Sequence, residues 1–274
     1  MPFTLIKGRF KPQAGVPDGD SVRFLAADLS LWERLQGRPV KLGIGPETKD
    51  TVQLRFEGID SIEKAATQPL ANQSRDNMFK LINFNAATNP EPAGYILVRM
   101  TEDKSGRPIC FVFAGPTRRA DGADVLLDGP MLRDSVNYKQ MLEGFAYPLY
   151  YNTLFANLRN EFNAALAKAK ANHRGYWPKD RTRKGVTVRV TADLATIPPI
   201  WPKLWRRLQE FLRANKPMSE FIAFLEGKNE RIDILSIMEE RGLQDLIEVR
   251  GNKVKMTEPP ENLRVVGKAG ARNR

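Results

Sequence analysis

Five charged side chains in the first 107 residues have the types and the spacing that phosphate chemistry requires. Asp20 ends an Asp-Gly-Asp turn, Arg55 comes five residues before Asp60, Glu63 comes three residues after it, and Arg107 ends a Ser-Gly-Arg sequence. Two of the carboxylates could bind a hard, oxygen-preferring cation and the third could activate water, while paired guanidinium N–H groups could hold a phosphate. Each motif alone is a common turn or helix start. Together they favour phosphodiester hydrolysis.

The order and spacing of these residues resemble the staphylococcal nuclease (thermonuclease) family over about residues 3–178. The downstream sequences Leu142-Glu143-Gly144-Phe145-Ala146 and Gly175-Tyr176-Trp177 resemble the helical end of that family. The resemblance implies an OB-like five-stranded barrel with packed helices. It also implies a calcium-dependent endonuclease that hydrolyses phosphodiester bonds of DNA, RNA or both.

The resemblance further assigns a metal site. It implies that the carboxylates of Asp20 and Asp60 bind calcium, with the backbone carbonyl of Ser61 as a further oxygen ligand. Ser61 replaces the usual small residue after the aspartate but keeps that carbonyl. Ile62 stands where the family generally has proline, which predicts a less rigid loop before the next functional residue.

The same resemblance assigns the catalytic residues. Glu63 would be the general base that activates water, while Arg55 and Arg107 would bind the scissile phosphate and stabilise the charge that develops on it. Tyr150 matches a tyrosine of the family's nucleotide pocket, and a half-buried core aromatic is an equally good interpretation. Ser105 occupies a position where some members have tyrosine. An insertion over residues 116–130 could alter substrate access.

The elements that must position these residues follow from hydrophobic periodicity. Residues 21–24 and 52–57 alternate apolar and polar side chains, which predicts strands with Arg55 on the face opposite Val52, Leu54 and Phe56. We expect further strands over residues 95–100 and 108–115. Helices are expected over residues 69–83, 136–145 and 154–166. The fold class is therefore α+β.

The polar, basic stretch 179–188 predicts a domain boundary. Residues 1–180 would form the barrel domain, and residues 181–274 a linker and a small, mainly helical domain with its own core. We expect helices at residues 201–212, 221–225 and 232–238, and a β-hairpin over 247–256. Three helices with a hairpin are compatible with a winged-helix-like module, although a packing or protein-interaction domain is favoured.

Composition narrows the class of protein. The chain has 274 residues, a formal net charge of +11 and a pI near 9.8, with +7 carried by residues 1–185 and +4 by residues 186–274. This balance favours a nucleic-acid partner. Cys110 is the only cysteine and His173 the only histidine. This excludes an internal disulfide and a zinc site built from cysteine and histidine ligands. No membrane span or signal peptide is visible, so we expect a cytoplasmic protein.

Two functions remain open from the sequence. One is the calcium-dependent nuclease. The other is a weak or inactive nuclease-like barrel that serves as a nucleic-acid or protein-binding module, with residues 186–274 as a possible contact for a protein partner. The presence of all five functional positions favours the nuclease.

Overall fold

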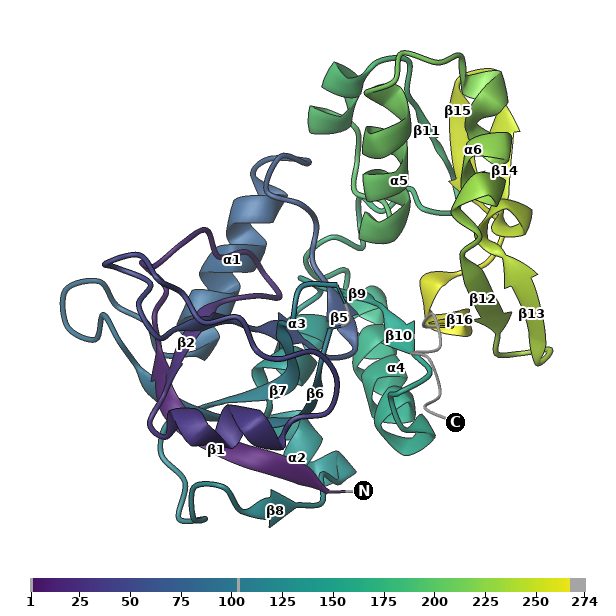
Figure 1. Ribbon diagram of the computed structural model, residues 1–274. Coiled ribbons are helices and arrows are strands. Elements are labelled where there is room, and N and C mark those ends of the chain that lie inside the picture. The colour runs from purple at the N-terminus through teal and green to yellow at the C-terminus, as the bar shows by residue number, and fades with distance from the viewer. Residues whose placement is uncertain (1, 103, 267–274) are drawn as a thin grey trace.

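The computed structural model describes residues 2–102 and 104–266, and its fold is mixed α+β (Figure 1). The α-helices are α1 Leu70–Leu81, α2 Gly129–Asp134, α3 Val136–Leu142, α4 Ala156–Ala171, α5 Pro202–Leu212 and α6 Phe221–Lys228. Short 3₁₀ helices cover Leu29–Arg34, Thr191–Ala195, Met218–Glu220, Leu243–Leu246 and Pro260–Asn262. The helices expected at 69–83, 136–145, 154–166, 201–212 and 221–225 are therefore confirmed.

The first part of the chain forms a nearly closed, barrel-like sheet. Its strands are β1 Phe3–Phe10, β2 Arg23–Ala26, β3 Val52–Gln53, β4 Arg55–Phe56, β6 Ala93–Thr101, β7 Pro108–Ala114 and β8 Asp124–Val125. The hydrogen-bonded order is β3-β2-β1-β6-β7-β4, and β8 pairs with β1. Because only Leu54 separates β3 from β4 in the chain, the two ends of this order meet and the sheet nearly closes on itself. The strands expected at 95–100 and 108–115 are confirmed as β6 and β7.

The barrel interior is filled as the two-residue period predicts. Val52, Leu54 and Phe56 are buried in the barrel core, whereas Arg55 between them is only partly buried. This alternation is the expected one, and it leaves the Arg55 guanidinium available outside that core. The fully buried Asn137 of α3 then ties the helix to the barrel, because its amide group bonds Val112 N (2.9 Å) and the carbonyl oxygens of Glu57 and Cys110 (both 3.0 Å).

Residues 181–266, which we call the C-terminal part, contain two α-helices and all strands but one of two small sheets. The remaining strands are β5 Ile59–Asp60, β9 Tyr147–Pro148, β10 Tyr150–Tyr151, β11 Val186–Thr187, β12 Arg231–Ile234, β13 Glu239–Gly242, β14 Ile247–Arg250, β15 Lys253–Met256 and β16 Leu263–Val265. The sheet orders are β10-β16-β12-β13 and β11-β15-β14, and β5 pairs with β9. The predicted hairpin is confirmed as β14 and β15.

The prediction of a third helix in this region, over residues 232–238, is wrong. Residues 231–234 form β12 and residues 239–242 form β13, and the two strands pair antiparallel. Ile232 and Ile234 are both buried and are separated by one polar residue, so the period is two, and β-branched side chains favour a strand. The preceding helix α6 ends at Lys228 and is followed by Asn229 in the left-handed conformation (φ 50°). Residues 181–266 therefore lack the third helix of a winged-helix arrangement.

The two parts of the chain share a hydrophobic core. Parallel β10 and β16 join them directly, with Tyr150 opposite Arg264. The second core combines barrel-side residues with residues of the C-terminal part, among them Ile62, Leu70, Tyr147, Leu149 and Tyr176 with Trp201, Leu204, Leu208 and Phe211. Figure 1 shows α5 on the side of the barrel where β5 and β9 lie. No helix within the described residues is long and apolar enough to cross a membrane.

Candidate active site at the junction of the barrel and helix α5

The Asp-Gly-Asp turn is held against α1 by a tight set of contacts. The side-chain amide of Gln140 donates to Gly19 O (2.6 Å) and to Ser74 O (3.0 Å). A Cβ on Gly19 would lie 1.9 Å from Ser74 Oγ, so only glycine fits between the turn and the helix. Asp18 accepts bonds from the backbone N–H of Asp20 (3.3 Å) and from a neighbouring serine. These contacts fix the backbone of the turn that carries Asp20.

Asp20 and Asp60 lie close together at the end of the barrel. Asp60 is the last residue of β5, is opposite Tyr147 of β9, and is 1% exposed. The hydroxyl of Ser61 donates to Asp20 Oδ1 (3.2 Å), so the residue after Asp60 contacts the first aspartate. Burial, together with the charges of Asp18 and Asp60, raises the pKa of Asp20 well above its ordinary value. The two carboxylates therefore repel each other in a poorly solvated place.

Arg55 of β4 interacts electrostatically with this carboxylate pair. Burial by itself would lower the pKa of Arg55, but the surrounding anionic groups, Asp60 and Asp20 among them, raise it above its ordinary value. Its guanidinium also lies 6.0 Å from the centroid of the Tyr151 ring. Arg55 is therefore a permanently charged group directed at the two aspartates.

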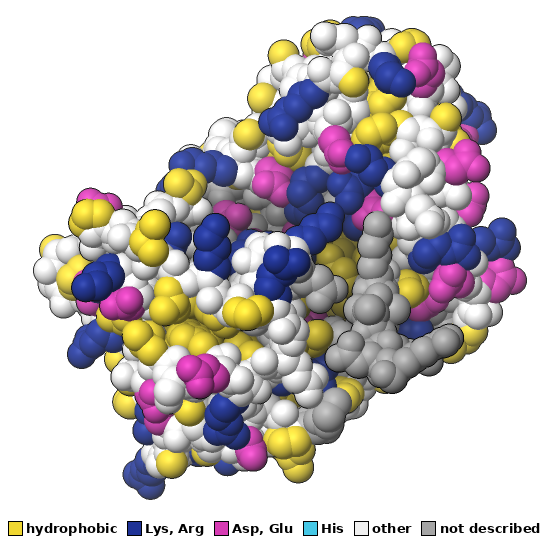
Figure 2. All heavy atoms as spheres, in the orientation of Figure 1, with side chains coloured by type: hydrophobic (Ala, Val, Ile, Leu, Met, Phe, Trp, Pro, Cys, Tyr) yellow, Lys and Arg dark blue, Asp and Glu magenta, His cyan; other side chains and the backbone are white. Residues whose placement is uncertain are grey.

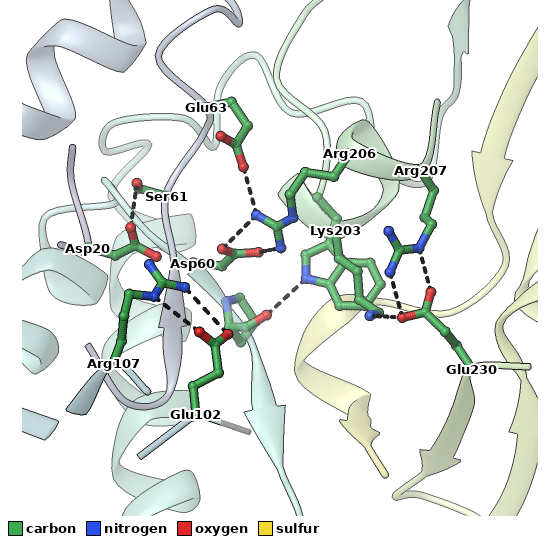
Figure 3. Close-up of polar contacts among 12 residues, drawn as sticks. Asp20, Asp60, Ser61, Glu63, Glu102, Arg107, Lys203, Arg206, Arg207 and Glu230 are labelled. Atoms are coloured by element: carbon green, nitrogen blue, oxygen red, sulfur yellow. Dashed lines mark hydrogen bonds and ion pairs between the residues drawn. The ribbon is translucent and has the colours of Figure 1, made fainter. Parts of the chain in front are cut away.

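Arg107 reaches the same region from the turn of the β6–β7 hairpin, directly before β7. Its Nε donates to Glu102 (3.1 Å) and to the hydroxyl of Ser105 (3.3 Å). Ser105 in turn donates to Glu102, so this hydroxyl helps to orient the arginine. Figure 3 shows Arg107, Asp20 and Asp60 pointing toward one another from separate segments of the barrel. Glu102 interacts electrostatically with both Arg55 and Arg107, so the two arginines lie on the same side of the site.

A residue of the C-terminal part enters this site. The guanidinium of Arg206, on α5, donates to Asp60 Oδ1 (3.0 Å) and Oδ2 (2.7 Å), and also to Glu63 Oε1 (2.8 Å). Figure 3 shows this guanidinium between the two carboxylates. Burial would lower the pKa of Arg206, but the two carboxylates raise it above its ordinary value. Two of the sequence-predicted functional groups are therefore paired with one cation from another part of the chain.

Helix α5 is anchored on both of its sides. At its start, the Trp201 indole donates to Pro148 O in β9 (3.0 Å). One turn later, Lys203 pairs with Glu230, and Arg207 donates to both oxygens of Glu230 (2.6 and 2.8 Å). Figure 3 shows this second ion-pair group to the right of Arg206, on the side away from Asp60. The backbone that carries Arg206 is thus fixed to β9 and to the beginning of β12.

The possible ligand atoms at this site are of the chemical type that calcium binds. Asp20, Asp60 and the carbonyl of Ser61 supply hard oxygen ligands, and the mutual repulsion of the two carboxylates is what a divalent cation would relieve. Within residues 2–102 and 104–266, however, no three or more His, Cys, Asp or Glu side chains are grouped to hold a metal ion. Water molecules would have to complete the coordination, and both Asp60 oxygens are bonded to Arg206 in this arrangement.

Two sequence-predicted features lie away from the carboxylates. Tyr150 is 1% exposed, packs near Phe162 in the barrel core and donates its hydroxyl to Asn163 (2.7 Å). The insertion at residues 116–130 contributes β8, which pairs with the start of β1 on the side of the barrel away from α5 (Figure 1). The adjacent Tyr151, rather than Tyr150, is the aromatic residue beside Arg55.

Sequence reasoning missed Glu102, Tyr151 and Arg206. A signal for Glu102 existed, because Glu102 and Arg107 lie at the two ends of the short connection between the strands expected at 95–100 and 108–115. In the structure the backbone N–H of Glu102 donates to the Arg107 carbonyl across this turn (2.8 Å). Arg206 had no such signal. Its place on the polar side of an amphipathic helix predicts only that it avoids the core, and nothing in the pattern indicates what that side faces.

Comparisons with known proteins add no relative. No protein-family model matches the chain, and no curated protein matches it.

Proposed function

We propose that the chain is a calcium-dependent nuclease that hydrolyses phosphodiester bonds of DNA, RNA or both, on an OB-like barrel of the staphylococcal nuclease type. The observation that carries the proposal is the convergence of Asp20, Asp60, Arg55 and Arg107 at one end of the barrel, with Glu63 joined to Asp60 through Arg206. These residues come from four separate segments of the chain. A core-packing role gives no reason for so many charges to meet there.

The chain's own residues can perform most of the reaction. Arg55 and Arg107 would each bind oxygens of the scissile phosphate and stabilise the charge that develops at phosphorus. Glu63 would take a proton from the attacking water, and its partly exposed side chain is accessible for that purpose. Bound calcium would supply a Lewis acid to the phosphate and lower the pKa of a nearby water.

Basic side chains at the junction and on a second surface support a polyanionic substrate. Figure 2 shows Lys and Arg side chains gathered in the hollow between the barrel and the C-terminal part. A separate surface hollow of about 170 Å³ on the β11-β15-β14 sheet is lined by Arg183, Lys184, Glu248, Arg250, Lys253 and Lys255. Such surfaces attract phosphate backbones without reading sequence.

One observation favours the second candidate function, a barrel that binds partners without catalysis. Asp60 and Glu63 are both satisfied by Arg206 in this structure, so the site is stable without a metal ion or substrate. A protein that needed the barrel only as a scaffold could keep such an ion-pair group. The two candidates differ in whether Glu63 contributes to turnover.

Replacement of Glu63 tests the proposal. Glu63→Gln keeps the size and hydrogen-bonding capacity of the side chain and removes the base, so we expect unchanged nucleic-acid binding and cleavage lowered by about 10²-fold or more. Cleavage of single-stranded DNA, duplex DNA and RNA would be measured in calcium and in chelator. The matched control is Glu33→Gln, which changes an exposed glutamate on another segment.

Two results would contradict the nuclease. Wild-type protein that binds these substrates but cleaves none of them in saturating calcium would favour the binding module. Cleavage by Glu63→Gln at the wild-type rate would remove Glu63 from its assigned role.

A further inference from the structure

We propose that Arg206 is a built-in competitor for the carboxylate site, and that the C-terminal part thereby holds the nuclease centre closed until a divalent cation displaces the guanidinium. The inference rests on the proposed function, because it assigns Asp60 to the cation and Glu63 to the base. We call the set of ion pairs between Arg206, Asp60 and Glu63 the Arg206 clamp.

The clamp engages the groups that the reaction would need free. Its two N–H groups bond both oxygens of Asp60, at 3.0 and 2.7 Å, so the bidentate pair leaves no uncommitted carboxylate oxygen there. The bond to Glu63 Oε1 (2.8 Å) directs a cation at the proposed base. The same guanidinium therefore occupies one oxygen of the proposed base. Metal binding and base catalysis are both opposed by one side chain.

The clamp does not neutralise the whole site. Hydrogen bonds from Arg206 reach Asp60 and Glu63, whereas Asp20 is contacted by Ser61 and is surrounded by the charges of Asp18 and Asp60. The guanidinium groups of Arg55 and Arg206 both act on the carboxylates, but Asp20 still lies beside the charges of Asp18 and Asp60. A divalent cation between Asp20 and Asp60 would relieve that repulsion, so it has an electrostatic advantage over the guanidinium.

Release of the clamp requires movement of a side chain and not of the helix. The Arg206 side chain is 33% exposed and has a path to solvent. Its helix is fixed by the Trp201 bond to Pro148 and by the group of Lys203, Arg207 and Glu230. The C-terminal part can therefore stay docked while Arg206 exchanges with a cation, and the shared core is not disrupted.

Calcium binding by the full-length chain tests the clamp directly. We would titrate calcium chloride alone into wild type, Arg206→Gln and Arg206→Lys by calorimetry, and measure cleavage of a single-stranded oligonucleotide over the same calcium range. Arg206→Gln removes the competitor, so we expect calcium affinity to rise at least about fivefold, the lower end of typical coupling between sites. Cleavage at limiting calcium should rise in proportion.

Arg206→Lys and one further variant serve as controls. Arg206→Lys keeps the charge but cannot bond both Asp60 oxygens and Glu63 together, so its calcium affinity should lie between those of wild type and Arg206→Gln. Arg213→Gln changes an exposed arginine directly after the same helix, and should leave calcium affinity unchanged. Cooperative thermal unfolding in calcium would verify that each variant is folded.

The outcomes separate the clamp from the function on which it rests. Unchanged calcium affinity in folded Arg206→Gln or Arg206→Lys overturns the clamp, whether or not wild type is a nuclease. Cleavage that falls in Arg206→Gln at saturating calcium also overturns it, because Arg206 would then assist the reaction as a third phosphate-binding arginine. If no form of the protein cleaves, the nuclease proposal fails, and the rise in calcium affinity alone decides whether Arg206 competes for the cation site.

Discussion

At the scale of single residues, the Asp20 carboxylate has an electrostatically unfavourable environment. The carboxylate is 7% exposed, accepts one bond from Ser61, and lies beside the charges of Asp18 and Asp60. A group whose pKa is raised on folding is destabilising whenever it is ionised, so ionised Asp20 opposes folding at neutral pH. Such local cost is typical of a functional position.

We therefore expect Asp20→Asn to stabilise the protein in chelator at pH 7 and to abolish stabilisation by calcium. The amide keeps an oxygen for the Ser61 hydroxyl and removes the charge, and each kcal/mol gained should raise Tm by about 2 to 4 °C. Calcium at millimolar concentration should raise Tm in wild type by mass action and leave the variant unchanged. Thermal unfolding with and without calcium checks both statements.

The control for this prediction is Asp134→Asn, which removes an exposed carboxylate at the end of α2. A wild-type Tm that does not respond to calcium, or a variant that responds as wild type does, would contradict Asp20 as a ligand.

At the scale of elements, the position of α5 depends on Glu230. Burial by itself would raise the pKa of Glu230, but hydrogen bonds and charge from Arg207 and Lys203 lower it to about 2. A depressed pKa means that the ionised carboxylate stabilises the fold at neutral pH. This contribution is complete above the unfolded pKa of about 4.3 and is lost as the pH falls toward 2.

We expect Glu230→Gln to lower the free energy of unfolding by about 2 kcal/mol at pH 7, since it leaves two cations without their shared carboxylate. The difference from wild type should be constant above about pH 5 and should shrink between about pH 4.3 and 2. Denaturant unfolding at a series of pH values measures it. Glu226→Gln, an exposed change on α6, is the control, and a difference that does not depend on pH would contradict the ion-pair origin.

Sequence patterns predicted helices and strands well where the spacing of the apolar residues fits a single period. The alternation at residues 52–57 predicted extended backbone, which the structure has as the short strands β3 and β4, and the direction of Arg55 away from the barrel core. The apolar stripe of residues 201–212 predicted α5. The helix predicted over residues 232–238 is wrong because a seven-residue segment with few apolar positions fits both the helical and the strand period. Pairing of β12 with both β13 and β16 then decides for a strand, and that information is not local.

The candidate site was predictable only in part, for a related reason. Asp20, Asp60, Glu63, Arg55 and Arg107 form a motif whose order along the chain is itself the signal. Arg206 belongs to the same site, but it follows Glu63 by 143 residues and reaches it through tertiary packing alone. No short-range pattern encodes such a contact.

At the scale of the whole molecule, the two parts of the chain are joined more closely than the sequence suggests. The sequence predicts a separate core for the later segment, and the domain boundary near residue 180 stays a prediction. In the structure, Ile62, Tyr147 and Tyr176 are buried in a core that the C-terminal part completes. β16 also covers the edge of β10.

We expect removal of residues 186–274 to lower Tm and to increase binding of a hydrophobic dye, because the truncation exposes these apolar side chains and an unpaired strand. The truncated protein also lacks Arg206, so any soluble fraction should cleave at lower calcium concentration than the full chain. Unfolding and cleavage measurements on residues 1–185 check both effects. A fragment as stable as the full chain would show that the barrel side needs no partner.

The position of Arg206 so late in the chain has a consequence for protein synthesis. A ribosome that adds about 5 to 20 residues per second makes Arg206 roughly 7 to 29 s after Glu63, so the carboxylates emerge without their intramolecular partner. The strand that completes the β10 edge is made later still, since β16 begins at Leu263. A chain whose translation stops early therefore lacks the Arg206 clamp and part of the shared core together. An unclamped product would be a poorly folded one, which cellular proteases remove preferentially.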